Sequence, residues 1–145
     1  MTPLYGHDEL VAGFVCKLIK GMDRGFDNYK AIGFLDNQNR LVAGMVYHNW
    51  HPEAGVIEMS GAATTPKWLT KPVLNLIFDY PFRVCGCQMA VMNVSEHNKR
   101  LHRQLHAAGF KSHTIPRLRG RDEDGILFTL TDTDWYAGKF ANGQT

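Results

Sequence analysis

The stretch "NVSEHNKRLHRQLHAAGF", which runs from Asn93 to Phe110, decides the fold. Its second part predicts a helix that begins at Asn98, because an Asn side chain accepts hydrogen bonds from the first free N–H groups of a helix. Gly109 predicts the helix end, since glycine readily takes the left-handed conformation there. The apolar residues between them recur at helical spacing and form one stripe: Leu101, Leu105 and Ala108.

The residues before this helix predict a buried strand and, further upstream, a second helix. "CGCQMAVMNV", residues 85–94, is nearly all apolar, as expected of a strand that is buried on both faces. "TTPKWLTKPVLNLIFDYPF", residues 64–82, predicts a helix whose start Thr70 can cap. Pro72 is compatible with this helix only because it lies in the first turn. The buried stripe expected here is Leu74, Ile77, Phe78 and Phe82.

The N-terminal half predicts a helix followed by three antiparallel strands. A helix is expected over residues 7–22, capped by Asp8 or, less favourably, by His7. Its buried side should hold Leu10, Phe14, Val15 and Leu18. Three segments then have strand-like composition and are separated by polar turns: residues 30–36, 40–50 and 54–63.

The C-terminal part predicts one more strand. Residues 114–120 and the charged turn 121–125 lead into a strand over residues 126–131, followed by a tail around Trp135. The expected order is therefore αβββαβαβ. This order indicates one α/β domain over residues 1–145, with a mostly antiparallel mixed sheet and flanking helices.

The composition is that of an ordinary globular protein. Of its 145 residues, 44% are hydrophobic and 21% are charged, which suffices for one domain with its own core. The net charge of +2 is small for a nucleic-acid binder. An odd number of cysteines without zinc-like spacing predicts free thiols: Cys16, Cys85 and Cys87. Because no leader and no long apolar run is recognisable, we expect a cytoplasmic protein without a membrane span.

The order of elements and the stretch from Asn93 to Phe110 resemble the GNAT superfamily of acyl-CoA N-acyltransferases. Members commonly show an Asn, a helix with a small or apolar stripe, and a Gly-Phe at the distance that separates Asn98 from Gly109. "DYPF", which ends at Phe82, is similar to the end of the family's preceding helix. Residues 58–82 also resemble small GNAT-like proteins encoded by phages and prophages.

The resemblance implies acetyl-CoA or another acyl-CoA as cofactor and an amine as acceptor. In the family, two central strands diverge and the pantetheine arm of the cofactor lies between them. The pyrophosphate rests on the N-terminus of the following helix, where free N–H groups and the helix dipole favour an anion. The cofactor-binding residues implied here are Met59, Ser60, Gly61, Ala62, Lys67, Trp68, Leu69, Thr70, Lys71, Asn93, Asn98, Arg100 and Leu101.

The phosphate-binding loop departs from the family's pattern. Its glycines fall on Trp68 and Thr70, and Pro72 removes one N–H donor from the helix start. Lys67 and Lys71 can supply positive charge instead. Two interpretations stay open: a remodelled pyrophosphate site, or a helix start that is packed under Trp68 and binds no ligand.

Glu58 lies near the strand position from which many relatives take a general base. The alternative is a solvated or salt-bridged Glu on the outer face of the strand. At the helix position where relatives often carry a Tyr general acid, this chain has Leu105. Candidates for that vacant role are Tyr47, His48, His51 and His106. His102 and His106 share a helix face, and we interpret them as solvent-facing residues rather than metal ligands.

"VYHNWHP", residues 46–52, predicts the substrate side of the site, because polar and aromatic residues collect there at a strand end. The substrate-contacting residues expected are Asn49, Trp50 and His51, with Phe26 from the loop 22–26 as the opposite wall. The acceptor is a small-molecule or macromolecular amine, and a homodimer is compatible with the sequence.

Two other functions remain open at this point. One is a GNAT-fold enzyme that modifies DNA or nucleobases, using Trp50 and Trp68 for stacking and a modestly basic region. The other is a non-catalytic binding protein that keeps only the scaffold. The basic region consists of Lys99, Arg100, Arg103, Arg117, Arg119 and Arg121.

Overall fold

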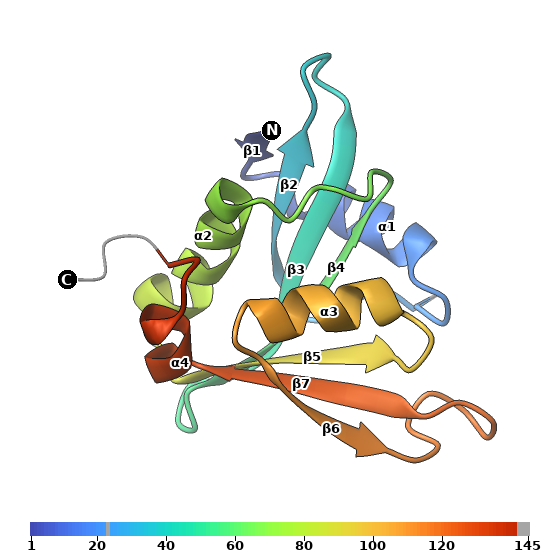
Figure 1. Cartoon of the computed structure of the whole chain (residues 1–145). Coiled ribbons are helices and arrows are strands. Elements are labelled where there is room, and N and C mark those ends of the chain that lie inside the picture. Colours follow the sequence, from blue (N-terminus) through green and yellow to red (C-terminus); the bar gives the residue numbers. More distant parts are fainter. Residues whose placement is uncertain (23, 142–145) are drawn as a thin grey trace.

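A computed structural model of the chain describes residues 1–22 and 24–141. It contains both helices and strands, and three of the strands, between Lys30 and Ala63, follow one another along the chain (Figure 1). Asp23, in the predicted loop 22–26, and residues 142–145 lie outside the described residues. The elements are β1 (Thr2–Leu4), α1 (Asp8–Leu18), β2 (Lys30–Leu35), β3 (Leu41–His51), β4 (Val56–Ala63), α2 (Lys71–Asp79), the π-helix η1 (Tyr80–Val84), β5 (Met89–Ser95), α3 (Lys99–Ala107), β6 (Lys111–Ile115), β7 (Gly125–Thr131) and α4 (Asp132–Ala137).

All seven strands form one sheet in the order β1-β2-β3-β4-β5-β7-β6. Neighbouring strands are antiparallel except β4 and β5, which pair in parallel. The predicted hairpin, the three-strand meander and the mostly antiparallel α/β class are confirmed. Three elements were not predicted: β1, β6 and α4.

Helices cover both faces of the sheet. α1 packs on β2, β3 and β4, and its buried residues form a small core with Ala31 and Val46. Residues of α2, α3 and α4 contribute to the main core on the other face (Figure 1). α1 lies very close to β3, because a Cβ at Gly44 would be 2.7 Å from Val11 Cγ1. Glycine at this position therefore lets the helix approach the strand.

Of the predicted buried face of α1, Val15 is buried and Phe14 is half-buried against the same core, whereas Leu10 and Leu18 are exposed. Val11, Ala12 and Val15 face the sheet, whereas Leu10 is 59% exposed. The valines fit against the glycines of β2 and β3, a contact that helical spacing alone does not reveal. The preferred cap candidate, Asp8, is already helical, and its carboxylate accepts from the Ala31 N–H at 3.3 Å. The other candidate, His7, occupies the N-cap position, and its side chain makes no cap hydrogen bond to the described residues.

The second predicted helix is confirmed as α2 and η1. Thr70 occupies the N-cap position and Pro72 lies in the first turn, although the Thr70 side chain makes no cap hydrogen bond to the described residues. The helix continues beyond Asp79 as one π-helical turn. The predicted stripe is buried: Leu74, Ile77, Phe78 and Phe82.

The helix of the deciding stretch is confirmed as α3. Asn98 caps it by accepting from the Leu101 N–H at 3.4 Å, and Gly109 has a φ of 104°. The strand before it, β5, is not buried on both faces as predicted. Its burial alternates, with Ala90, Met92 and Val94 in the core. The other face of β5 is half-buried, and the main contacts of α1 are with β2, β3 and β4.

Candidate functional site

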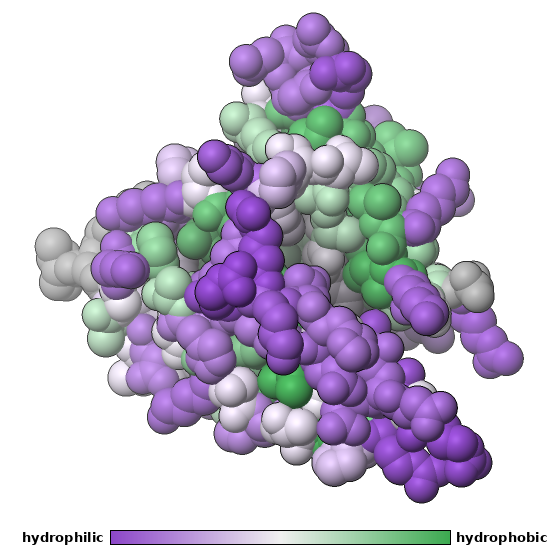
Figure 2. Space-filling view, turned by 45° about the vertical axis from the view of Figure 1, so that its right-hand side comes forward, coloured by the Kyte–Doolittle hydropathy of each residue, from purple (hydrophilic) through white to green (hydrophobic). Residues whose placement is uncertain are grey.

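The pairing of β4 with β5 ends early and leaves a fork in the sheet. Within the described ranges, register pairs join the two strands only from Val56–Met89 to Glu58–Val91. Beyond them the strands diverge (Figure 1), and in Figure 2 the surface is hollowed between the upper and lower parts of the molecule. The backbone of Met59–Ala63 thus faces the fork without strand partners from β5.

Two predicted catalytic residues meet at the start of this fork. His48 on β3 is paired directly with Glu58 on β4, so both side chains are on the face that carries α1. His48 Nε2 lies 3.9 Å from Glu58 Oε2 and 2.8 Å from Ser60 Oγ. The ring of Phe26 lies against His48 with 4.7 Å between centroids. The imidazole is therefore held from three sides.

The environment of His48 favours the neutral imidazole. The side chain is buried, and burial lowers the pKa of His48 below its ordinary value of 6.5, although the charge of Glu58 acts in the opposite direction. A neutral imidazole can accept a proton at neutral pH.

Asn49 orients Glu58. Its Nδ2 donates to Glu58 Oε1 at 2.8 Å, and its φ of 49° places it in the left-handed region. The register of β3 against β4 shifts between His48 and His51, so Asn49 lies in a β-bulge. The bulge is what turns the Asn49 side chain to Glu58, whose side chain keeps 28% exposure. The carboxylate is thus both fixed and accessible.

Tyr47, the third predicted catalytic residue, lies on the opposite face of the sheet. Its hydroxyl donates to the Ile77 carbonyl oxygen and its ring packs on Tyr80 with 4.7 Å between centroids. Complete burial raises the pKa of Tyr47 well above its usual value. The structure does not bring this side chain together with His48 and Glu58.

Solved structures resemble this chain, whereas no family model and no curated protein matches it. A mutant form of the spermidine N-acetyltransferase SpeG from Vibrio cholerae is 12% identical, with a TM-score of 0.74 over 93% of this chain and 97% of that chain. The dodecameric structure of the Vibrio cholerae enzyme is also 12% identical, with a TM-score of 0.73 over 92% and 95% of the two chains. The fold is that of the GNAT acetyltransferases.

A shorter match points to the same fold. A protein from T. thermophilus, provisionally assigned as an acetyltransferase, is 18% identical with a TM-score of 0.66 over 76% of this chain. This chain spans 62% of the length of that protein. Low identities of this kind establish the GNAT architecture, and the chemistry must be argued from the residues.

In this GNAT fold, Trp68 turns away from the helix start and into the core. It is 8% exposed, and its ring lies against Phe34 with 6.0 Å between centroids. Lys67, Thr70 and Lys71 are exposed around the start of α2. The indole therefore does not cover the N-terminus of α2. The first turn of the helix, which presents free N–H groups, has two exposed lysines beside it.

The residues of the fork fit an acyl-CoA. The predicted segment Met59–Ala62 offers backbone groups that face away from β3, although the Met59 side chain itself is buried in the core. On β5, Asn93 Oδ1 is buried and has no hydrogen-bond partner among the described residues. It lies toward β7, because a Cβ at Gly125 would be 3.1 Å from it, so this predicted cofactor contact is not turned to the fork.

The remaining predicted site residues lie at the edges of the fork or away from it. Asn98 and Leu101 are engaged in the cap of α3, and Arg100 is exposed beside them. Trp50 and His51 are exposed at the end of β3. The half-buried Leu69 lies between the two lysines and α2.

The two histidines of α3 lie in different environments, and of the two only His106 faces solvent as predicted. His102 Nε2 lies 2.8 Å from the Ser95 carbonyl oxygen, and His106 is exposed. Among residues 1–22 and 24–141, no group of three or more potential metal ligands is found. The same part of the chain contains no helix that is long and apolar enough to cross a membrane.

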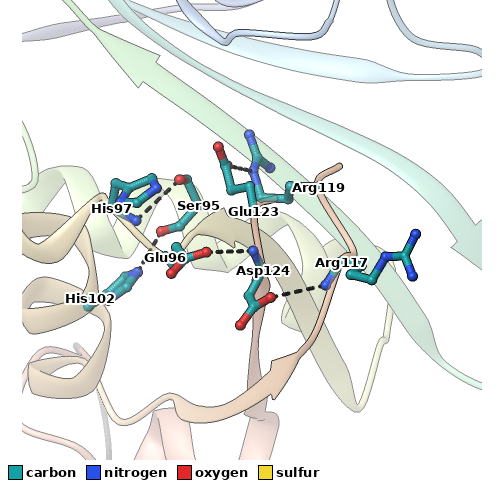
Figure 3. A network of polar contacts seen from close by, with 8 residues as sticks. All are labelled: Ser95, Glu96, His97, His102, Arg117, Arg119, Glu123 and Asp124. Atoms are coloured by element: carbon teal, nitrogen blue, oxygen red, sulfur yellow. Dashed lines mark hydrogen bonds and ion pairs between the residues drawn. The ribbon is translucent and has the colours of Figure 1, made fainter. Parts of the chain in front are cut away.

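The end of β5 is tied to the β6–β7 loop by polar contacts (Figure 3). Arg119 Nε donates to Glu123 Oε2 at 3.0 Å, and hydrogen bonds from Ser95 and Arg119 lower the pKa of Glu123. The Asp124 N–H donates to Glu96 Oε2 at 2.6 Å. This loop therefore mixes acidic and basic side chains, and the predicted basic region is interrupted where Arg119 is paired with Glu123.

Sequence reasoning did not find how Ser60 and Asn49 act. The side chain of Ser60, a predicted cofactor contact, is hydrogen-bonded to His48. Asn49 was expected to contact substrate, and it holds Glu58. Both hydrogen bonds depend on the register of β3 against β4. That register is set by a β-bulge, which no residue pattern in the sequence marks clearly.

Proposed function

We propose that this protein is an N-acyltransferase that carries an acetyl or related acyl group from acyl-CoA to an amine, which attacks directly. One observation carries the proposal: the Glu58–His48 pair lies where β4 and β5 begin to diverge. A proton acceptor at that point would be beside the reacting amine if the cofactor arm follows the fork.

Three residues of the chain would have distinct roles in the proton transfer. The Glu58 carboxylate, oriented by Asn49, attracts a protonated amine and accepts its proton. His48 is neutral and adjacent, so it can take that proton onward from Glu58. Bound acyl-CoA would supply a thioester carbonyl that is reactive toward the neutral amine: the C–N bond of the amide would form as the C–S bond breaks, and CoA would leave as a thiolate that takes up a proton.

Two parts of the chain would bind the cofactor. Backbone groups of Met59–Ala62 would hold the pantetheine arm. Lys67 and Lys71, with the N–H groups at the start of α2, would hold the phosphates.

The chemistry of Glu58 favours an amine that is cationic before it reacts. Its carboxylate keeps solvent access, and the side chain beside it, His48, is uncharged when the amine arrives. Spermidine is the first acceptor to test, because SpeG is a spermidine N-acetyltransferase. The dodecameric assembly of that enzyme also supports a search for self-association of this chain, for which a homodimer is the simplest form.

The test is a thiol-release assay with acetyl-CoA and a panel of amines that includes spermidine, an aminoglycoside and a lysine peptide. We expect acceptor-dependent release of free CoA and a rise in melting temperature with CoA alone, because a ligand that binds the native state stabilises it. Absence of both at millimolar cofactor contradicts the proposal. A melting shift with CoA but no transfer to any amine of the panel would contradict transfer to these acceptors and leave the non-catalytic binding protein and the nucleobase-modifying enzyme as alternatives.

A further inference from the structure

α1 carries a second apolar stripe along its exposed edge. Leu10 and Leu18 are 59% and 45% exposed, and Phe14 between them is half-buried because it also packs against the small core under α1. Their spacing of four residues places the three side chains along one line of the helix. They line an open groove of about 930 Å³. Such a continuous apolar line at the surface is typical of an interaction site.

Gly13 lies in the middle of α1 beside this stripe. It is exposed, and a Cβ at this position would meet no atom within 4 Å. Packing within the chain thus does not require glycine here, although glycine destabilises a helix interior relative to alanine. A second helix that approaches the backbone of α1 closely would require it.

The charges at the two ends of α1 have opposite signs. The exposed Glu9 lies four residues before Gly13, and the exposed Lys17 lies four residues after it. If two copies of α1 pack antiparallel about Gly13, Glu9 of each copy comes beside Lys17 of the other. Parallel packing would instead bring like charges together, which is unfavourable.

We propose that the α1 stripe (Glu9, Leu10, Gly13, Phe14, Lys17 and Leu18) binds the same stripe of a second copy. The dimer is two-fold symmetric, with the α1 helices antiparallel and Gly13 close to the axis. The leucines and Phe14 supply buried apolar area, and the two Glu9–Lys17 pairs set the direction of the helices. The stripe supports this interface whether or not the chain transfers acyl groups.

The first experiment is light scattering on the full chain at concentrations on the order of 100 μM. We expect the mass of a dimer, and the mass of a monomer for the variant with both Leu10→Asp and Leu18→Asp. Leu118→Asp, at an exposed leucine of the β6–β7 loop, is the matched control and stays dimeric. A monomeric native chain, or a dimer that survives both α1 substitutions, overturns the proposal.

Charge exchange tests the antiparallel arrangement with folded variants. Glu9→Lys and Lys17→Glu should each weaken dimerisation by about tenfold, and the double exchange or an equimolar mixture of the two variants should restore it. Failure of both restorations overturns the antiparallel geometry. Thiol release is measured in parallel, so that loss of the proposed acyl transfer and loss of the dimer are seen separately.

Discussion

His48 and Glu58 face each other on neighbouring strands, with Nε2 3.9 Å from Oε2, and each is held by its own partner. Ser60 holds the imidazole and Asn49 holds the carboxylate. The pair therefore has a defined geometry before any ligand arrives, which is a condition for efficient proton transfer.

Glu58→Gln should lower kcat/KM for acyl transfer by about 10²- to 10⁴-fold, because the amide cannot accept a proton from the amine. The melting shift with CoA should persist, since Glu58 is not needed to hold the cofactor. Glu53→Gln, at an exposed position of the β3–β4 turn, is the control and should leave kcat/KM unchanged. Equal activity of both variants would remove Glu58 from the mechanism.

His48 should make the stability of the protein depend on pH. Its folded-state pKa lies below the ordinary 6.5, so the unfolded chain binds more protons as the pH falls through that value. The free energy of unfolding should therefore decrease on acidification below about pH 6.5 and be fully restored above it. Urea unfolding of the native chain and of His48→Gln measures this, and the variant should show the weaker dependence.

The charge of Glu58 opposes the effect of burial on His48. Glu58→Gln should consequently lower the pKa of His48 further, which an NMR titration of the imidazole measures directly. An upward movement of that pKa would show that the two groups do not interact as their geometry implies.

Asn49 combines a hydrogen bond with a left-handed backbone, and two substitutions separate these roles. Asn49→Gly keeps the backbone conformation and should lower kcat while it changes stability little. Asn49→Ala should lower kcat equally and also lower the free energy of unfolding by about 1 kcal/mol, since alanine is strained at positive φ. Equal stability of the two variants would contradict a strained position.

Trp68 should behave as a core residue. Trp68→Ala should cost about 3–5 kcal/mol in the free energy of unfolding, whereas Trp68→Phe should cost about 1 kcal/mol. The dissociation constant of CoA, measured by calorimetry on Trp68→Phe, should stay within about twofold of the native value. A large change in affinity without a change in stability would place the indole in the cofactor site.

Lys67 and Lys71 should contribute to CoA affinity through charge. Replacing both by Glu should raise the dissociation constant roughly tenfold at low salt and by less at high salt, because ions screen exposed charges. Lys20→Glu, at an exposed lysine after α1, provides the control. An affinity that is independent of salt would contradict this binding mode.

Local patterns determined a large part of this fold. The polar turn between residues 36 and 40 predicts the β2–β3 hairpin, because turn residues and alternation are read over a few positions. Asn98 and Gly109 mark both ends of α3 for the same reason. β1 and β6 escaped prediction because one has three residues and the other is exposed along its whole length.

The sequence predicted which residues belong to the candidate site, but not which of them contact one another. Glu58 and His48 were both singled out, and their contact was not, since it depends on the register that a bulge sets between β3 and β4. Tyr47 was grouped with them because it is adjacent to His48 in sequence. Strand alternation sends it to the opposite face of the sheet.

The sequence by itself thus determined the elements other than β1, β6 and α4, the order of those elements, and the chemistry available to the chain. Tertiary packing decided which faces are used: Val11 and Val15 fit the glycines of the sheet, so Leu10 and Leu18 are left at the surface. It also decided that Trp68 packs against Phe34 and that β4 and β5 separate after Glu58. These outcomes depend on contacts between residues that are far apart in the chain. Local sequence patterns do not predict such contacts.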